Sequence, residues 1–473
     1  MDEETYTGGA PGLRRALGTF DLVLLNVAAI VGLRWLSTAA QLGPSSLTLW
    51  VVGCLLFFVP SGLAVQELSS RIPHEGGFHL WTKAAFGELH GFLAGWAYWL
   101  SNLVFFPSLL LFATVVAIQL GGPETRKLAE SPWYNGIAGL AVLWGVTYMN
   151  ILGLRRAKWL QNAAGFATFA ATAQIVFAGF LAWWHYGSAT PLTAASLVPN
   201  LASPYVFNTF AILILAYTGF ELAPLLGDEI RDTERSVRRA VYISGALITI
   251  IYVAGTAALL MALPVAQINV ISGVPEAMNA IGARSGLPFF GLIAVVLITI
   301  TSLGGLSGWV AGTARLPFVI GLSHYLPEQL GAIHPRYRSP HVALLVQAGA
   351  VSLAMLAAIS GSTIHEAFLL LIDMTVALNC AVWVYIFASL LVLRRRAAGR
   401  NEGIALVPGG LLGCTLVAVV GALAAACATV VSMIPPSGSD HPALFLVKGI
   451  GGCALILAAG IVVFRSASKR VTR

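Results

Sequence analysis

Twelve long apolar segments constrain the fold of this chain more than any other feature of its sequence. A helix needs about 17 to 25 apolar residues, at a rise of about 1.5 Å each, to cross a hydrocarbon core about 30 Å thick. The segments that meet this requirement are 19–40, 47–68, 88–120, 134–150, 159–184, 205–226, 240–263, 286–315, 342–359, 366–393, 405–433 and 443–464. We therefore predict an all-α integral membrane protein with twelve transmembrane helices.

The composition excludes several other classes of protein. Of the 473 residues, 58% are hydrophobic and only 10% are charged, whereas soluble domains carry about 25% charged residues. The five cysteines lie in apolar segments without CxxC spacing, which predicts neither disulfides nor a zinc site. The sequence has no P-loop and no HExxH motif. Asn102, Asn150 and Asn379 are polar residues within spans, but no nucleophile, base and orienting group come together. We expect neither an enzyme nor a cofactor.

The distribution of positive charge predicts the orientation in the membrane. If the N-terminus is cytoplasmic, 21 of the 27 Lys and Arg residues fall on cytoplasmic segments. The positive-inside rule then places both termini in the cytoplasm, and the net charge of +7 reflects topology, with no nucleic-acid partner. The N-terminal segment lacks the pattern of a cleaved signal peptide. We expect a multi-pass protein of the plasma membrane, the inner membrane in a prokaryotic cell.

The spacing of the two longest segments, 88–120 and 286–315, indicates an internal repeat. They are five spans apart, and a repeat of five helices must be inverted relative to its copy, as in many secondary transporters. The predicted organisation is a cytoplasmic N-terminal segment 1–18, a first repeat 19–184, an inverted second repeat 205–393, helices 11 and 12 in 405–464, and a cytoplasmic tail 465–473.

Spans 1 and 6 occupy matching places in the two repeats, and each has a glycine and an ionisable residue near its middle. The pairs are Gly32 with Arg34 and Gly219 with Glu221. A single glycine also serves close helix packing, but the matched pair predicts two interrupted helices whose free backbone groups bind a zwitterion. The predicted substrate-binding residues are Ala28, Ile30, Gly32, Leu33, Arg34, Leu215, Ala216, Tyr217, Gly219 and Phe220.

Several motifs resemble the amino acid-polyamine-organocation (APC) superfamily of transporters. They are Glu67 to Phe78 (ELSSRIPHEGGF) with Ala85-Phe86-Gly87 and Gly95-Trp96, Tyr217 to Glu221 (YTGFE) with Asp228-Glu229, Gly304 to Trp309 (GGLSGW) with Arg315, and His334 to Pro340 (HPRYRSP). The resemblance implies a LeuT-type inverted five-helix repeat plus two further helices, and transport of amino acids or amines by alternating access. It also implies that Glu221 matches a position used in proton-linked gating.

Four residues are predicted to gate or couple transport: Arg34, Asp373, Glu221 and Tyr217. Arg34 and Asp373 lie at similar depths in spans 1 and 10, about 9 to 10 Å from their outer ends. An unpaired charge at that depth costs about 3 kcal/mol, so one hypothesis pairs the two residues as an outer gate. The other assigns Arg34 to a second carboxylate of an acidic substrate. Snorkelling is the simpler alternative for Arg34, and a helix-terminus contact is the simpler alternative for Glu221.

Further residues are predicted to bind an ion, to wall the cavity or to pair at the membrane interface. Ala28, Val31, Thr301 and Ser302 form a weaker candidate set for sodium. In span 5, Thr168 stands where several superfamily members have a lysine in place of sodium, so the resemblance leaves the coupling ion open. Trp35, Trp96, Tyr98, Tyr217 and Phe220 are expected to wall the cavity, because aromatic faces stabilise an ammonium group. Asp228 and Glu229, with Arg231 and Arg235, are expected to form an interfacial ion-pair cluster, and an inner gate is the alternative role for the two acids.

Together these features predict secondary active transport of amino acids or related amines, by proton symport or by exchange against a counter-substrate. The alternatives are a polyamine or organic-cation transporter of the same fold and, less consistent with the sequence, a channel or a substrate sensor. The expected partners are the small substrate, protons or a counter-substrate, and the lipid bilayer.

Overall fold

A computed structural model describes residues 17–74, 76–270, 273–287, 289–322, 325–359, 364–398, 406–434 and 442–471. Most of the predicted N-terminal segment 1–18 and the last two residues of the predicted tail therefore lie outside the described residues. In the described part, the secondary structure is helical apart from one isolated bridge between Leu17 and Ile230.

Each of the twelve predicted segments coincides with a helix or a pair of helices. In chain order they are α1 (Thr19–Ile30) with α2 (Arg34–Ala40), α3 (Ser45–Gly53) with α4 (Val59–Arg71), α6 (Glu88–Ala117), α7 (Pro132–Ile151), α8 (Leu154–Tyr186), α9 (Pro204–Ala216) with α10 (Leu222–Leu225), α11 (Thr233–Ala262), α13 (Phe290–Thr313), α15 (His341–Ile359), α16 (Ile364–Ala398), α17 (Gly410–Val431) and α18 (Pro442–Val471).

Shorter helices lie between these segments. They are α5 (Phe78–Phe86), α12 (Gly273–Arg284) and α14 (Arg315–Leu322), the π-helical turn η1 (Cys54–Phe58), and the 3₁₀ turns η2 (Ile118–Gly121), η3 (Pro123–Glu130), η4 (Gly227–Glu229), η5 (Val265–Gln267) and η6 (Glu328–Gly331). The π-helical turn ends just before Pro60, which has no N–H to donate, so the regular hydrogen-bond ladder is interrupted there.

The count of spans that the helices support is smaller than predicted. Among the described residues, nine helices are long and apolar enough to cross a membrane, and the bent pair α1 and α2 makes a tenth. The predicted span 205–226 contains α9, which has only 13 residues because the chain leaves the helix after Ala216. The predicted span 134–150 is α7, whose aromatic, amide and glycine residues lower its hydropathy. The molecule is thus an all-helical membrane protein with nine or ten candidate spans.

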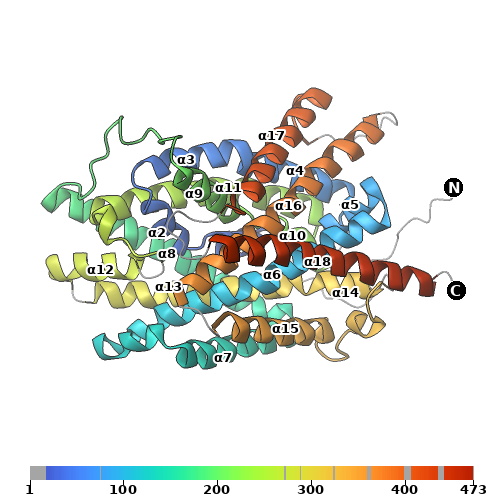
Figure 1. Ribbon diagram of the computed structural model, residues 1–473, viewed down its shortest axis with the longest axis horizontal. Helices are drawn as coiled ribbons and strands as arrows, with labels where there is room; N and C mark the ends of the chain where they lie inside the picture. The colour runs from blue at the N-terminus through green and yellow to red at the C-terminus, as the bar shows by residue number, and fades with distance from the viewer. Residues whose placement is uncertain are drawn as a thin grey trace.

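The long helices form one bundle, and its two ends differ (Figure 1). Figure 1 shows α5 and α14 toward one end of the bundle and α12 at the opposite end; we call these the α5 end and the α12 end. Inside the bundle, α1 packs against α8, α11 and α13, and α6 packs against α13 and α16. The interrupted helix α1–α2 is therefore enclosed by long continuous helices on several sides.

Candidate functional site

The two predicted helix interruptions are present and adjoin each other. Helix α1 ends at Ile30 and α2 begins at Arg34, with a bend of 45° between them. Helix α9 ends at Ala216 and α10 begins at Leu222. Gly219, in the second interruption, has a φ of +133°, and a Cβ atom there would lie 2.5 Å from Cγ1 of Ile30. Only glycine fits this backbone and this contact between the two breaks.

A tyrosine from α11 joins the carbonyl ends of both interrupted helices. The Tyr252 hydroxyl lies 2.6 Å from the carbonyl oxygen of Ile30 and 2.9 Å from that of Ala216. The side chain is completely buried and stacks on Trp50. One hydroxyl group therefore contacts the carbonyl oxygens of the last residues of both α1 and α9. The sequence analysis missed Tyr252, whose only signal is a phenol within an apolar segment, and a phenol needs a partner when buried.

The start of α2 has backbone N–H groups that find no hydrogen-bond acceptor among the described residues. Trp35 N–H donates to Gly32 and Leu36 N–H donates to Leu33. The N–H groups of Leu33 and Arg34 have no acceptor among the described residues. Free N–H groups at a helix N-terminus favour an anion, and the helix dipole acts in the same direction. The segment Gly32 to Arg34, which belongs to the predicted substrate-binding residues, thus has open donors for an anion.

Two small cavities flank the break between α1 and α2. The first, of about 10 Å³, is lined by Ala29, Ile30, Arg34, Trp35, Asn102, Phe105, Leu215, Ala216, Thr218, Trp309, Thr375 and Asn379. The second, of about 30 Å³, is lined by Ala28, Ala29, Val31, Gly32, Leu33, Arg34, Leu109, Phe112, Ile298, Thr301, Ser302, Gly305, Leu306 and Trp309. Such volumes hold about one water molecule each, so the structure is closed around the break.

The predicted binding residues divide into two groups. Seven of them line a cavity: Ala28, Ile30, Gly32, Leu33, Arg34, Leu215 and Ala216. Tyr217, Gly219 and Phe220 do not. The Tyr217 hydroxyl donates to the Trp50 carbonyl at 3.0 Å, and the Phe220 ring stacks on Phe58. These two aromatic residues of the second break therefore contact α3 and the π-helical turn η1 and do not line either cavity.

The aromatic wall is built only in part from the residues that were expected. Trp35 lines the first cavity, while Trp96 donates its indole N–H to Ile456 O on α18 and Tyr98 contacts Glu221. Sequence reasoning missed Phe105, Phe112 and Trp309 as wall residues. Trp309 lies within a quoted motif and donates to the carbonyl of Ala29 at 2.9 Å.

Arg34 is a buried charge surrounded by aromatic rings. Its side chain is 4% exposed, and its guanidinium carbon lies 4.1 Å from the ring centre of Trp35 and 5.2 Å from that of Phe105. In the described residues it forms no ion pair or side-chain hydrogen bond, and its Nε atom is buried without a partner. Cation–π contacts replace only part of the lost hydration. The site therefore holds a positive charge that a ligand anion would neutralise.

Asp373 is also buried, but it lies outside both cavity linings. It is 5% exposed and, among the described residues, has no ion pair with Arg34 or with any other residue. Helix α16 instead contributes Thr375 and Asn379 to the first cavity. The structure thus shows an unpaired Arg34 and an unpaired Asp373 in one closed conformation.

Glu221 is the last residue of the second break and caps it internally. One carboxylate oxygen accepts the Gly219 N–H at 2.7 Å, and the other accepts the Tyr98 hydroxyl at 2.7 Å. The residue is completely buried. Glu221 therefore connects the break to α6 through Tyr98, which the sequence analysis had placed in the cavity wall.

The candidate sodium residues Ala28, Val31, Thr301 and Ser302 all line the second cavity. The Ser302 hydroxyl donates to Ile298 O at 2.8 Å, one helical turn earlier. Thr168 of α8 donates to Ala164 O and lies 3.3 Å from the Thr301 hydroxyl. In the part of the chain that the structure describes, no three His, Cys, Asp or Glu side chains gather as a metal site. The four oxygen-bearing residues remain a prediction.

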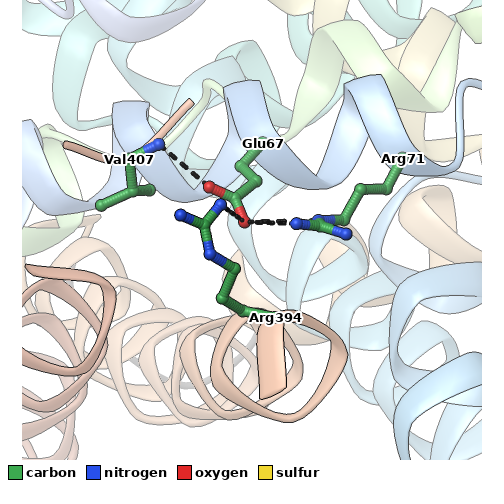
Figure 2. Close-up of polar contacts among 4 residues, drawn as sticks. All are labelled: Glu67, Arg71, Arg394 and Val407. Carbon is green, nitrogen blue, oxygen red and sulfur yellow. Dashed lines mark hydrogen bonds and ion pairs between the residues drawn. The ribbon is translucent and has the colours of Figure 1, made fainter. Parts of the chain in front are cut away.

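Ion pairs close the α5 end of the bundle. Figure 2 shows Glu67 of α4 between Arg71 and Arg394, with the backbone N–H of Val407 on its other oxygen. The Arg394 guanidinium comes from α16, at 2.9 Å. Glu67 is completely buried, so this cluster ties α4, α16 and the segment before α17 together.

A second buried pair lies at the same end and corrects one expectation. Glu229 binds Arg315 at the start of α14, with Nε at 3.0 Å and Nη2 at 2.5 Å from one carboxylate oxygen. Both side chains are 2% exposed. The predicted partners Arg231 and Arg235 were wrong: Arg235 pairs with Asp232, and Asp228 lies 4.0 Å from His74. The reason is that the chain turns at η4 and directs Glu229 inward.

Comparison with known proteins agrees with this geometry. A family model described as amino acid permease matches residues 17–458. An uncharacterized transporter of Legionella pneumophila is 26% identical over 95% of this chain and 95% of its own length. The serine/threonine exchanger of Bacillus subtilis is 24% identical over 83% of this chain and 86% of its own. A glutamate/gamma-aminobutyrate antiporter of Lactococcus lactis is 24% identical over 82% and 77%.

The family model covers nearly the whole chain, and it describes transporters, not enzymes. The relatives include exchangers and permeases. The family also implies the LeuT fold, with which the two adjoining breaks are consistent. This chain belongs to the amino acid permease family of the APC superfamily and is a multi-pass membrane transporter of amino acids.

Proposed function

We propose that the chain is a secondary active transporter that binds a zwitterionic amino acid between its two helix interruptions and carries it by alternating access. The observation that carries this proposal is the set of open donors at the start of α2: the N–H groups of Leu33 and Arg34 have no acceptor among the described residues and adjoin a cavity. The carboxylate of the substrate binds there. Its ammonium group binds at the carbonyls of Ile30 and Ala216, where it displaces the Tyr252 hydroxyl.

The proposed architecture is twelve spans with an inverted five-helix repeat, 19–184 and 205–393, followed by two helices in 405–464. Helix packing supports this arrangement: α8 packs against α13 in the way that α16 packs against α6. Exchanging each helix with the one five spans away converts the first pair into the second. With both termini in the cytoplasm, the α5 end faces the cytoplasm and the α12 end faces outward.

An amino acid fits this site better than a polyamine does. Arg34 lines both cavities, and no described carboxylate pairs with it. A polycation there would meet an uncompensated like charge, which disfavours binding. The second hypothesis for the same residue, an outer gate in which Arg34 pairs with Asp373, belongs to another conformation of the transport cycle.

Uptake by Arg34→Ala separates a gate from a substrate ligand. Neutral and acidic amino acids are compared in proteoliposomes at equal membrane potential. A gate defect lowers uptake of both classes by a similar factor. A loss of affinity confined to acidic substrates, with neutral substrates unchanged, would instead assign Arg34 to a second substrate carboxylate and end the gate hypothesis.

We propose Glu221 as the protonatable group if transport is coupled to protons, because it joins the second break to Tyr98 on a neighbouring helix. Exchange against a counter-substrate is the alternative. A Glu221→Gln variant separates them: proton symport predicts loss of pH-dependent accumulation, with counter-flow exchange retained. Accumulation with an unchanged pH dependence would remove Glu221 as the proton carrier.

The overall proposal is tested with purified protein in liposomes. A panel of radiolabelled amino acids and polyamines is offered with and without a pH gradient, with and without sodium, and with and without unlabelled substrate inside. Saturable flux of an amino acid that responds to one of these conditions supports the proposal. Non-saturable flux indicates a channel, and saturable binding without flux indicates a sensor.

A further inference from the structure

A third cavity lies at the α5 end, away from the two cavities at the helix breaks. Its volume is about 230 Å³, and it is lined by Leu152, Gly153, Leu154, Arg155, Arg156, Glu229, Arg336, Tyr337 and Arg338. It shares no lining residue with the central cavities. One wall is the connection from α7 to α8, and the other is the loop that precedes α15. The proposed substrate site at the helix breaks does not include this cavity.

The two walls are held together by specific contacts. Ser339 donates its hydroxyl to Ile151 O at 2.7 Å. Gly153 has a φ of +98°, and a Cβ there would lie 3.0 Å from the Tyr337 carbonyl oxygen. A side chain at this position would hold the loops apart, so glycine sets the width of the cavity.

The loop of the second wall is ordered by its own hydrogen bonds. His334 Nδ1 accepts the backbone N–H groups of Arg336 and Tyr337, each at 3.2 Å. The His334 N–H donates to Ser339 O at 2.8 Å, and the Arg338 N–H donates to His334 O at 2.9 Å. These bonds fix the backbone that carries two of the four arginines, so little ordering remains for a ligand to impose there.

The charge of the cavity wall is strongly positive. Arg155, Arg156, Arg336 and Arg338 all line it, and within the described residues none of the four forms an ion pair. Glu229 is the one acid among the described lining residues, and Arg315 already occupies it at 2.5 and 3.0 Å. Four exposed arginines thus line a cavity whose one described carboxylate already binds Arg315.

Tyr337 brings two of these cations to one ring. The guanidinium carbons of Arg156 and Arg336 lie 5.7 Å and 5.6 Å from its centre. The two cations repel each other, and a bound anion would offset that repulsion. Arginine matches tetrahedral phosphate oxygens with paired N–H donors, whereas a single carboxylate would satisfy fewer of the donors that four arginines supply.

From this cavity we infer a binding site for a phosphate-bearing anion, formed by Arg155, Arg156, Arg336 and Arg338 around Tyr337. The bound phosphate bridges the α7–α8 connection to the loop before α15, next to the Glu229–Arg315 pair. The phosphate comes either from an anionic phospholipid headgroup or from a soluble phosphate compound. In both cases binding links two segments at the α5 end and stabilises the closed arrangement of that end.

The test measures thermal unfolding of the purified full-length protein in a neutral detergent at constant ionic strength. One arm adds dioctanoyl-phosphatidylglycerol, with dioctanoyl-phosphatidylcholine as the zwitterionic control. The other arm adds inorganic pyrophosphate, with sodium sulfate as the anion control. We expect a saturable rise in the unfolding temperature with at least one phosphate compound and a smaller one with its control. A response to lipid alone assigns the phosphate to a headgroup, and a response to pyrophosphate alone assigns a soluble ligand.

Paired variants tie the response to the cavity. Arg336→Gln with Arg338→Gln should weaken the apparent affinity at least tenfold, because charge-assisted hydrogen bonds are removed. Arg239→Gln with Arg395→Gln removes the same charge from exposed positions outside the cavity and should leave the affinity unchanged. Arg336→Lys with Arg338→Lys, which keeps the charge, guards against misfolding and should bind with intermediate affinity. Equal affinity in the Gln pair and the charge-matched control, or no saturable response in either arm, would overturn the inference.

Discussion

The buried charges at the α5 end differ from those near the helix breaks in whether they have an ion-pair partner. Glu67 and Glu229 are buried and bind arginines at 2.5 to 3.3 Å. Arg34 and Asp373 are equally buried, but in the described residues neither has an ion pair. A paired buried charge holds segments together, whereas an unpaired one raises the energy of the resting state until a ligand or a conformational change supplies a partner. The paired charges therefore hold the α5 end closed, whereas the unpaired charges are available to a ligand or to a partner in another conformation.

The contacts that close the α5 end also differ in kind from those near the breaks. At the α5 end, α4, α16 and the segment before α17 meet on one carboxylate (Figure 2). Opening that end must separate Glu67 from Arg394 or carry both with one moving body. Near the breaks, the contacts are single hydrogen bonds such as those of Tyr252 and Trp309. Individual hydrogen bonds of this kind are worth about 1 kcal/mol each, so they are easily exchanged for substrate.

The largest effect on stability is expected from breaking the Glu229–Arg315 pair. Arg315→Met leaves Glu229 buried without its cation, which typically costs about 3–5 kcal/mol. We expect a clearly lower unfolding temperature for the purified protein. The double variant Arg315→Met/Glu229→Gln removes both charges and should recover most of the loss. An Arg315→Met protein that unfolds at the wild-type temperature would contradict the structural role of this pair.

Removing the unpaired charge should have the opposite effect on stability and a large effect on transport. Arg34→Met replaces a buried cation with an apolar side chain of similar length, so the unfolding temperature should stay the same or rise. Uptake measured as kcat/KM should fall about 100-fold, which is about 2.7 kcal/mol at 25 °C. Full transport activity in this variant, or a loss of stability as large as that of Arg315→Met, would remove the distinction between the two regions.

A smaller effect is expected from the hydroxyl that joins both breaks. Tyr252→Phe keeps the ring that stacks on Trp50 but leaves the carbonyls of Ile30 and Ala216 without this donor. The expected loss of stability is about 1–2 kcal/mol. Tyr242→Phe on the same helix changes an exposed side chain and is the matched control. If the two variants unfold at the same temperature, the hydroxyl does not hold the breaks together in the resting state.

The sequence was sufficient to predict helices at all twelve segments and interruptions at both glycines, because hydropathy and backbone freedom are local properties. It was not sufficient to predict partners across the bundle. Glu229 was assigned to Arg231 and Arg235 by proximity in the chain, yet it binds Arg315, which is 86 residues away. Tyr252 and Phe105 give no local signal of their contacts with the first break, since those contacts depend on how α11 and α6 pack. Helix length within a predicted span was not predictable either, since α9 stops after 13 residues where the chain leaves the helix.

The smallest expected effect concerns a buried histidine at the α5 end that forms no ion pair among the described residues. His79 of α5 is 2% exposed, its Nδ1 lies 2.8 Å from the Gly91 carbonyl oxygen, and its Nε2 has no partner within the described residues. Burial lowers the pKa of His79 from 6.5 to about 4. The unfolded chain therefore binds a proton more readily than the folded one does below pH 6.5, and stability decreases as the pH falls from 6.5 toward 4.

Between pH 7 and pH 5.5 this residue should lower the free energy of unfolding by about 1 kcal/mol. His79→Asn keeps an N–H donor for Gly91 O but does not titrate, so it should flatten the pH dependence of the unfolding temperature over that interval. His185→Asn, at an exposed position, is the control and should retain the wild-type slope. An unchanged slope in His79→Asn would mean that groups other than His79 cause the pH response and would contradict this prediction.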